Sequence, residues 1–106
     1  MPNNIKNKVE VAKMNNQKAI VITGASTGIG KACALYLDEL GYKVYAGVRK
    51  SSDGEKIRIE SSDNLVPILL DVSDEQSISK TVEFVKNETG GKLYGLVNNA
   101  GIGRGG

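Results

Sequence analysis

The sequence has little from which a metal site or a covalent cross-link could be built. Cys33 is the only cysteine, and histidine does not occur. A single thiol excludes an internal disulfide and a cysteine-based zinc site, so carboxylates alone would have to hold a transition metal. We therefore expect no metal site in this chain.

Long apolar runs and one-sided charge are also missing. No stretch approaches the ~18–20 apolar residues that are needed to span a bilayer, and residues 1–17 lack the apolar core of a signal peptide. The formal net charge is only +2, and no basic stripe is interleaved with aromatic residues. These absences argue against a membrane or a nucleic acid as partner, and they make the cytoplasm the expected location.

Glycine, by contrast, is abundant, with 13 residues in a chain of 106. A chain of this length forms one domain at most. We expect a polar N-terminal extension over residues 1–17 and a single domain over residues 18–106. Because glycine serves where the backbone turns sharply or approaches a ligand closely, the positions of these glycines within the domain matter.

Short apolar runs alternate with helical patterns along the domain. Four strands are predicted, over residues 19–22, 44–48, 65–70 and 93–98. Between them, apolar residues recur at helical spacing from Ile29 to Leu40, and a short helix is possible over residues 55–60. A third helix is expected to open with a capping box of Ser73 and Gln76 and to end near Gly90.

Strands that alternate with helices predict parallel pairing through right-handed crossovers. Pro67, which cannot donate a hydrogen bond, suggests an edge position or a strand start for the third strand. The expected fold is α/β: the first half of a Rossmann-like doubly wound parallel sheet, with about four strands in the order 3-2-1-4.

The turn after the first strand is the strongest functional signal. Gly24, Gly28 and Gly30 lie between a buried apolar strand and the start of a helix. The first amides of a helix lack partners and its positive end attracts anions, while glycines let a pyrophosphate come close. A tight turn that uses glycine only for packing is the alternative, but the flanking strand and helix favour dinucleotide binding.

The motifs in this region resemble those of the short-chain dehydrogenase/reductase family. Residues 23–30 match the pattern T-G-x-x-x-G-x-G, and residues 98–101 match N-N-A-G after the fourth predicted strand. Asp71 stands at the end of the third strand, where the family has an aspartate. The resemblance covers about residues 19–101, and it implies a nicotinamide dinucleotide as cofactor.

The resemblance also assigns roles to single residues. Ser26 and Ile29 would line the pyrophosphate, Asp71 would accept a hydrogen bond from the adenine amino group, and the Val72 amide would donate one to the ring. Three residues would lie beside the adenosine ribose: Asn98, Ala100 and Gly101. Asn99 would be structural. An alternative for Asp71 is that it helps to cap the next helix.

The end of the second strand favours NADP(H) over NAD(H). NAD-binding members carry an acid there for the ribose hydroxyls, whereas this chain has Val48 followed by Arg49 and Lys50. A guanidinium suits a 2′-phosphate, and Thr27 and Ser51 could add hydroxyl contacts. The alternative is that Arg49 and Lys50 form an ordinary exposed loop face.

The resemblance implies a reaction whose catalytic residues are not found in these 106 residues. The family transfers a hydride between the dinucleotide and an alcohol or carbonyl compound, with a tyrosine and a lysine at Y-x-x-x-K. None of the four tyrosines here has a lysine four positions later. We therefore predict no catalytic residue in this chain and interpret it as the NADP(H)-binding portion of a reductase, inactive alone.

Three other interpretations remain open at this stage. The chain could be a non-catalytic NADP(H)-binding module or degenerate copy, or a structural protein that pairs with another chain. An S-adenosylmethionine methyltransferase shares the sheet and the glycine loop, but it would want an acid where Arg49 stands. The substrate and the oligomeric state cannot be predicted.

Overall fold

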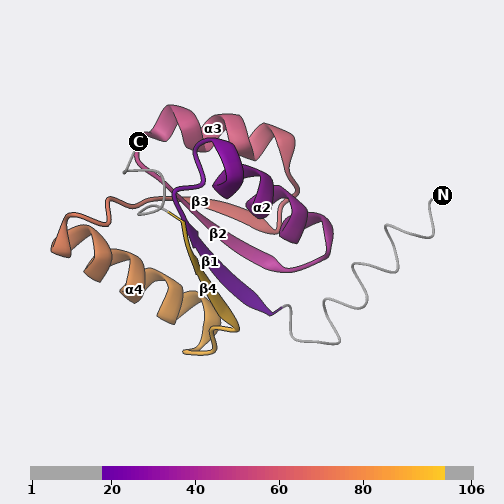
Figure 1. Cartoon of the computed structure of the whole chain (residues 1–106). Helices are drawn as coiled ribbons and strands as arrows, with labels where there is room; N and C mark the ends of the chain where they lie inside the picture. The colour runs from indigo at the N-terminus through magenta and orange to yellow at the C-terminus, as the bar shows by residue number, and fades with distance from the viewer. Residues whose placement is uncertain (1–17, 100–106) are drawn as a thin grey trace.

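The structure is a computed structural model that describes residues 18–99 (Figure 1). The predicted extension, Ala100 and Gly101 lie outside these residues. Four strands alternate with three helices: β1 (Ala19–Thr23), α2 (Gly28–Glu39), β2 (Lys43–Val48), α3 (Ser51–Glu60), β3 (Leu65–Leu69), α4 (Glu75–Thr89) and β4 (Gly95–Asn98). Every predicted strand and helix is present, and the differences lie at their ends.

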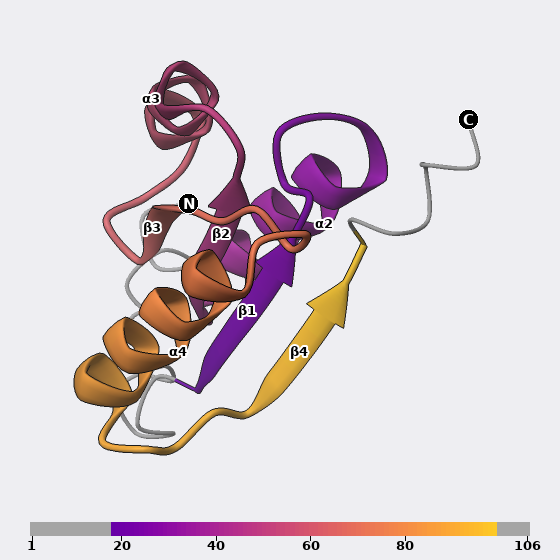
Figure 2. The same cartoon turned by 90° about the vertical axis from the view of Figure 1, so that its left-hand side faces the viewer.

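The strands form one parallel sheet in the order β3-β2-β1-β4, which confirms the predicted topology. Pro67 lies on the edge strand β3 and pairs with Ala46 of β2. At an edge, the N–H that proline lacks can point away from the sheet, so β2 loses no hydrogen bond. At the other edge, β4 pairs with β1 and with no further strand of the described range 18–99 (Figure 2). Since all four strands run in one direction, the segments that follow them gather at the carboxyl-terminal edge of the sheet.

Helix α3 is longer than predicted because it begins directly after β2. Gly54, in its first turn, lies close to Pro67 and Val48, and a β-carbon there would be 3.1 Å from the Pro67 Cβ. The alternation of Ile57 and Ile59 obscured the helix in the sequence. Only Ile57 faces the sheet, with 1% of its surface exposed against 83% for Ile59.

The predicted capping box at the start of α4 is wrong. Asp74 is the N-cap, and its carboxylate accepts a hydrogen bond from the amide of Gln76 at 3.0 Å. Ser73 lies one residue too early, and its hydroxyl instead donates to the Asp71 carboxylate. At the other end of α4, Gly90 closes the helix in the left-handed conformation (φ 68°), as glycine does at this position in many helices.

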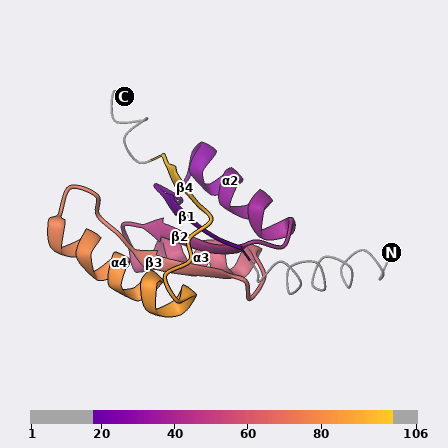
Figure 3. The same cartoon turned by 90° about the horizontal axis from the view of Figure 1, so that it is seen from below.

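Alternate residues along each strand point to opposite faces of the sheet. Figure 1 shows α2 and α3 on one face and α4 on the other. The α2/α3 face holds the larger core, whose buried members are Ile20, Ile22, Ala25, Ala34, Val44, Ala46, Val48, Ile57 and Leu65. The core on the α4 face has four buried members, Ala19, Val21, Tyr45 and Val85. Seen from below, α4 runs alongside β3 and leaves β4 uncovered (Figure 3).

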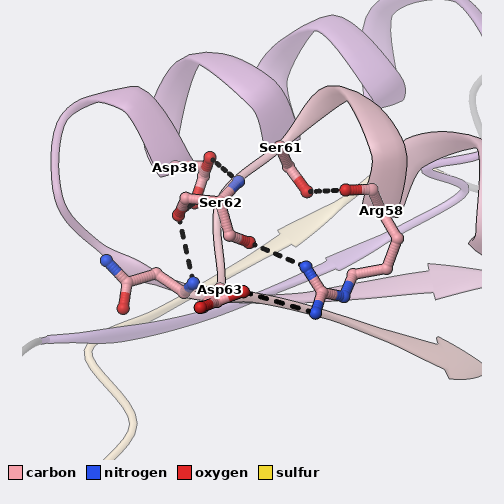
Figure 4. A network of polar contacts seen from close by, with 6 residues as sticks. Asp38, Arg58, Ser61, Ser62 and Asp63 are labelled. Carbon is pink, nitrogen blue, oxygen red and sulfur yellow. Dashed lines mark hydrogen bonds and ion pairs between the residues drawn. The ribbon is translucent and has the colours of Figure 1, made fainter.

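A polar cluster joins the ends of α2 and α3 (Figure 4). The buried Asp38 carboxylate accepts hydrogen bonds from the amide of Ser62 (2.9 Å) and from its hydroxyl (2.6 Å). Arg58 donates to the Ser62 carbonyl and to Asp63. A buried carboxylate needs such donors, and this pairing fixes how the two helices lie on the sheet.

Within residues 18–99, no helix has both the length and the apolar character that crossing a membrane requires.

Candidate functional site

The glycine-rich turn lies at the carboxyl-terminal edge of the sheet, between the end of β1 and the start of α2. Gly24 has φ +65° and Gly28 has φ +60°, a region that side chains with a β-carbon rarely adopt. The amide of Ala25 donates to the carbonyl of Gly47 at 2.8 Å, which fastens the turn to the neighbouring strand β2. The backbone conformation itself therefore requires two of the three glycines.

Gly30 is required for a different reason. A β-carbon at this position would collide with the Gly24 carbonyl oxygen and would lie 2.6 Å from the amide nitrogen of Asn99. The sequence predicted that the three glycines shape the turn and let a pyrophosphate come close. In the structure Gly30 keeps space for the turn itself, so that the first turn of α2 can pack onto it.

The N-terminus of α2 is open to an anion. Thr27 is the N-cap residue in an extended conformation, yet it makes no side-chain capping bond, and the first turn contains no acidic residue. The hydroxyls of Ser26 and Thr27 form no hydrogen bond with any residue of the described range 18–99, and Ile29 is 76% exposed beside them. Unpaired amides and the positive end of the helix dipole thus point into an accessible space.

Thr23 connects the ends of β1 and β4 beside this turn. Its hydroxyl donates to the side-chain carbonyl of Asn98 at 2.9 Å and accepts from the amide of Asn99 at 2.9 Å. The side chain of Asn99 in turn donates to the carbonyl of Gly24 at 3.2 Å. Asn99 therefore ties β4 to the glycine turn, in agreement with the structural role predicted for it.

Arg49 and Lys50 follow directly on β2, at the same edge of the sheet, and both are exposed. Lys50 is the N-cap residue of α3, and its carbonyl accepts from the amides of Asp53 and Gly54. Neither side chain forms a salt bridge with a residue between 18 and 99. Their charges are free to meet an anion from solution, and no carboxylate ends β2.

Asp71 serves the protein as well as the predicted site. One oxygen of its carboxylate accepts from both the hydroxyl (2.6 Å) and the amide (3.0 Å) of Ser73. These two hydrogen bonds, with a smaller contribution from Arg49, hold the pKa of Asp71 below its usual value. The alternative considered for Asp71, that it caps the next helix, is wrong, because Asp74 is the N-cap and Asp71 shapes the turn before it. The amide of Val72 forms no hydrogen bond within residues 18–99 and can still donate.

The structure thus brings eleven of the thirteen predicted residues to one edge of the sheet, in four segments that follow β1, β2, β3 and β4. The remaining two, Ala100 and Gly101, lie outside the described residues. Sequence reasoning missed the roles of Thr23 and Ala25, which position the turn. Thr23 could have been found, because it is the threonine that opens the first motif. Nothing in the sequence indicated the role of Ala25.

The sequence and the fold were compared with known proteins. The family described as short chain dehydrogenase matches residues 18–106. Dehydrogenase/reductase SDR family member 9 of Bos taurus is 38% identical over 100 residues, which are 93% of this chain and 31% of that protein. The 17-beta-hydroxysteroid dehydrogenase type 6 of Bos taurus is 39% identical over 94 residues, or 88% and 30% of the two chains.

Solved structures agree with this result. A short chain dehydrogenase from Bacillus anthracis superposes with a TM-score of 0.74 at 28% identity, over 79% of this chain and 34% of the other. The chain described here therefore spans about a third of the length of the proteins that it matches.

Proposed function

Because the chain belongs to the short chain dehydrogenase family, we propose that residues 18–106 bind NADP(H) for an oxidoreductase of that family. The observation that carries the proposal is the exposed N-terminus of α2, where glycines, two hydroxyls without a partner in residues 18–99 and the first amides of the helix lie together. That arrangement suits the two linked phosphates of a dinucleotide. The adenine would lie toward Asp71 and Val72, and its ribose beside Asn98, Ala100 and Gly101.

The preference for NADP(H) rests on charge at the end of β2. A 2′-phosphate beside Arg49 and Lys50 would meet two cations without a salt-bridge partner in residues 18–99. A ribose hydroxyl, by contrast, would find no carboxylate acceptor there. Charge-assisted hydrogen bonds of this kind contribute ~1.5–3 kcal/mol, or about ten- to hundredfold in affinity.

When bound, the reduced dinucleotide would donate a hydride to a carbonyl compound, and the oxidised form would accept one from the corresponding alcohol. The residues of this chain bind and orient the cofactor, since none of the four tyrosines forms a Y-x-x-x-K pair that could donate a proton. We therefore expect cofactor binding without turnover by these 106 residues. The same observation favours a second candidate function, a non-catalytic module that binds NADP(H).

Titration of the chain with NADPH and NADH, by calorimetry, tests the proposal. We expect NADPH to bind about ten- to hundredfold more tightly than NADH, and Arg49→Asp to reverse the order by removing the cation and restoring an acid. Arg58→Asp is the matched control, because Arg58 is exposed on α3 and its side chain makes only solvent-exposed contacts, with Asp63 at 3.5 Å and with the Ser62 carbonyl at 3.3 Å. Tighter binding of NADH by the unmodified chain would refute the preference, and no binding of either cofactor would refute the function.

A further inference from the structure

A second hollow lies at the opposite, amino-terminal edge of the sheet, away from the glycine turn. It is an open cavity of about 880 Å³ between the starts of β1 and β2 and the segment that follows α4. Lysines and tyrosines give it its character: Lys18, Lys43, Lys92, Tyr45 and Tyr94. None of these residues belongs to the dinucleotide site.

The charge of this cavity is positive, and one carboxylate offsets it only in part. Its lining contains three lysines and one carboxylate, that of Glu88. None of the three lysines forms a salt bridge with a residue in the described range, where the ion pairs are Lys31–Glu60 and Arg58–Asp63. Like charges that share one cavity repel each other, and an anionic ligand between them would relieve this repulsion.

Aromatic rings hold two of these lysines in place. The ammonium of Lys18 lies 4.5 Å from the centroid of the Tyr94 ring, which stacks on Tyr42 at 5.9 Å. The ammonium of Lys43 lies 6.0 Å from the ring of the buried Tyr45. A cation–π contact orients the ammonium but leaves its N–H groups free for an acceptor. The cationic groups are therefore positioned before any ligand arrives.

Apolar side chains stand next to the charges. Lys92 is followed by Leu93 and Tyr94, which line the cavity and are 45% and 59% exposed. A small soluble anion needs no exposed leucine or tyrosine. The interface of a bilayer takes up all three residue types together, since tyrosine and leucine enter the headgroup region while lysines meet anionic headgroups.

From this combination we propose that the cavity at the amino-terminal edge binds the phosphate-bearing headgroup of an anionic lipid, so that this edge of the sheet rests on a membrane surface. The opposite edge, with the dinucleotide site, then faces the aqueous phase. The inference does not depend on the proposed cofactor, because the two sites share no residue.

Co-sedimentation of the full chain with vesicles tests this site. We expect binding to vesicles of phosphatidylcholine with phosphatidylserine, weaker binding at high salt, and little binding to phosphatidylcholine alone. Lys18→Glu with Lys92→Glu should weaken binding at least about tenfold. Glu88→Gln should strengthen it, because it removes the one carboxylate of the cavity.

The matched control is Lys56→Glu with Lys80→Glu, which makes the same change in net charge on exposed positions of α3 and α4. Since residues 1–17 carry three further lysines, the contrast between the two double variants decides the test. Thermal unfolding should show that both remain folded.

Equal loss of binding in the two double variants, or equal binding to neutral vesicles, would overturn the proposal. So would an NMR titration in which glycerol 3-phosphate shifts the amides of Lys18 and Lys92 while vesicles do not bind. That result would assign the cavity to a soluble phosphate.

Discussion

The two faces of the sheet differ in how completely they are covered. On the α2/α3 face, nine residues form a closed core, and six of them have no measurable exposure. On the α4 face the core has four members, and the apolar side chains of Leu96, Val82 and Val72 are 63%, 57% and 43% exposed. The same strands therefore contribute to a closed hydrophobic core on one face and line an open groove of about 700 Å³ on the other.

This difference indicates that the α2/α3 face contributes more to the stability of the domain than the α4 face does. The glycine turn rests on the closed face, because Ala25 and Ala34 pack there and Gly30 fits against the turn. On the open face, the hydroxyl of Thr81 is buried and has no hydrogen-bond partner among residues 18–99, which is an unfavourable arrangement. A site that needs a fixed backbone is thus built over the better-packed half of the domain.

The largest effect is expected from a matched pair of substitutions, one in the core on each face of the sheet. Val44 and Val21 lie on neighbouring strands but face opposite sides, and they are 0% and 6% exposed. We expect Val44→Ala to lower the free energy of unfolding by about 2–3 kcal/mol and Val21→Ala by about 1 kcal/mol, because only the first leaves a closed cavity. Urea titrations followed by circular dichroism would measure both. Equal losses would mean that the α4 face is packed as tightly as its opposite.

Removal of one hydroxyl should have an intermediate effect. Thr23→Val keeps the shape of the side chain but breaks its hydrogen bonds to Asn98 and Asn99. We expect a loss of about 1–2 kcal/mol in stability, since two partly buried hydrogen bonds are lost. NADPH affinity should fall as well, because the glycine turn is no longer tied to β4. Thr27→Val is the control for stability, because Thr27 is exposed and its hydroxyl makes no hydrogen bond within residues 18–99. A similar loss there would contradict this account.

The smallest change is expected from Leu96→Lys on the open face. Because Leu96 is already 63% exposed, the free energy of unfolding should change by less than about 0.5 kcal/mol. The charge should also reduce association of the chain at high concentration, since β4 is an unprotected edge. Light scattering and thermal unfolding would show both effects. Unfolding of this variant would indicate that the groove is closed in solution.

The sequence predicted the order of the strands and the edge on which the site lies, because parallel topology follows from alternating strand and helix patterns. It also identified the residues of that edge through their position after each strand. It could not predict which contacts hold the turn, since the pairing of Thr23 with Asn98 joins residues 75 positions apart. The end of α4 was predicted from Gly90, but its start was not. Ser73 and Asp74 are both good capping residues, and only the hydrogen bond of Ser73 to Asp71 decides between them.

The bond between Asn99 and the Gly24 carbonyl makes the edge strand β4 a mechanical neighbour of the glycine turn. Any strand that pairs with β4 would restrict Asn99 and so steady the turn before a ligand arrives. Because such coupling is reciprocal, a dinucleotide that orders the turn would favour that pairing by the same factor. Binding of the dinucleotide and pairing of a further strand with β4 would then each strengthen the other.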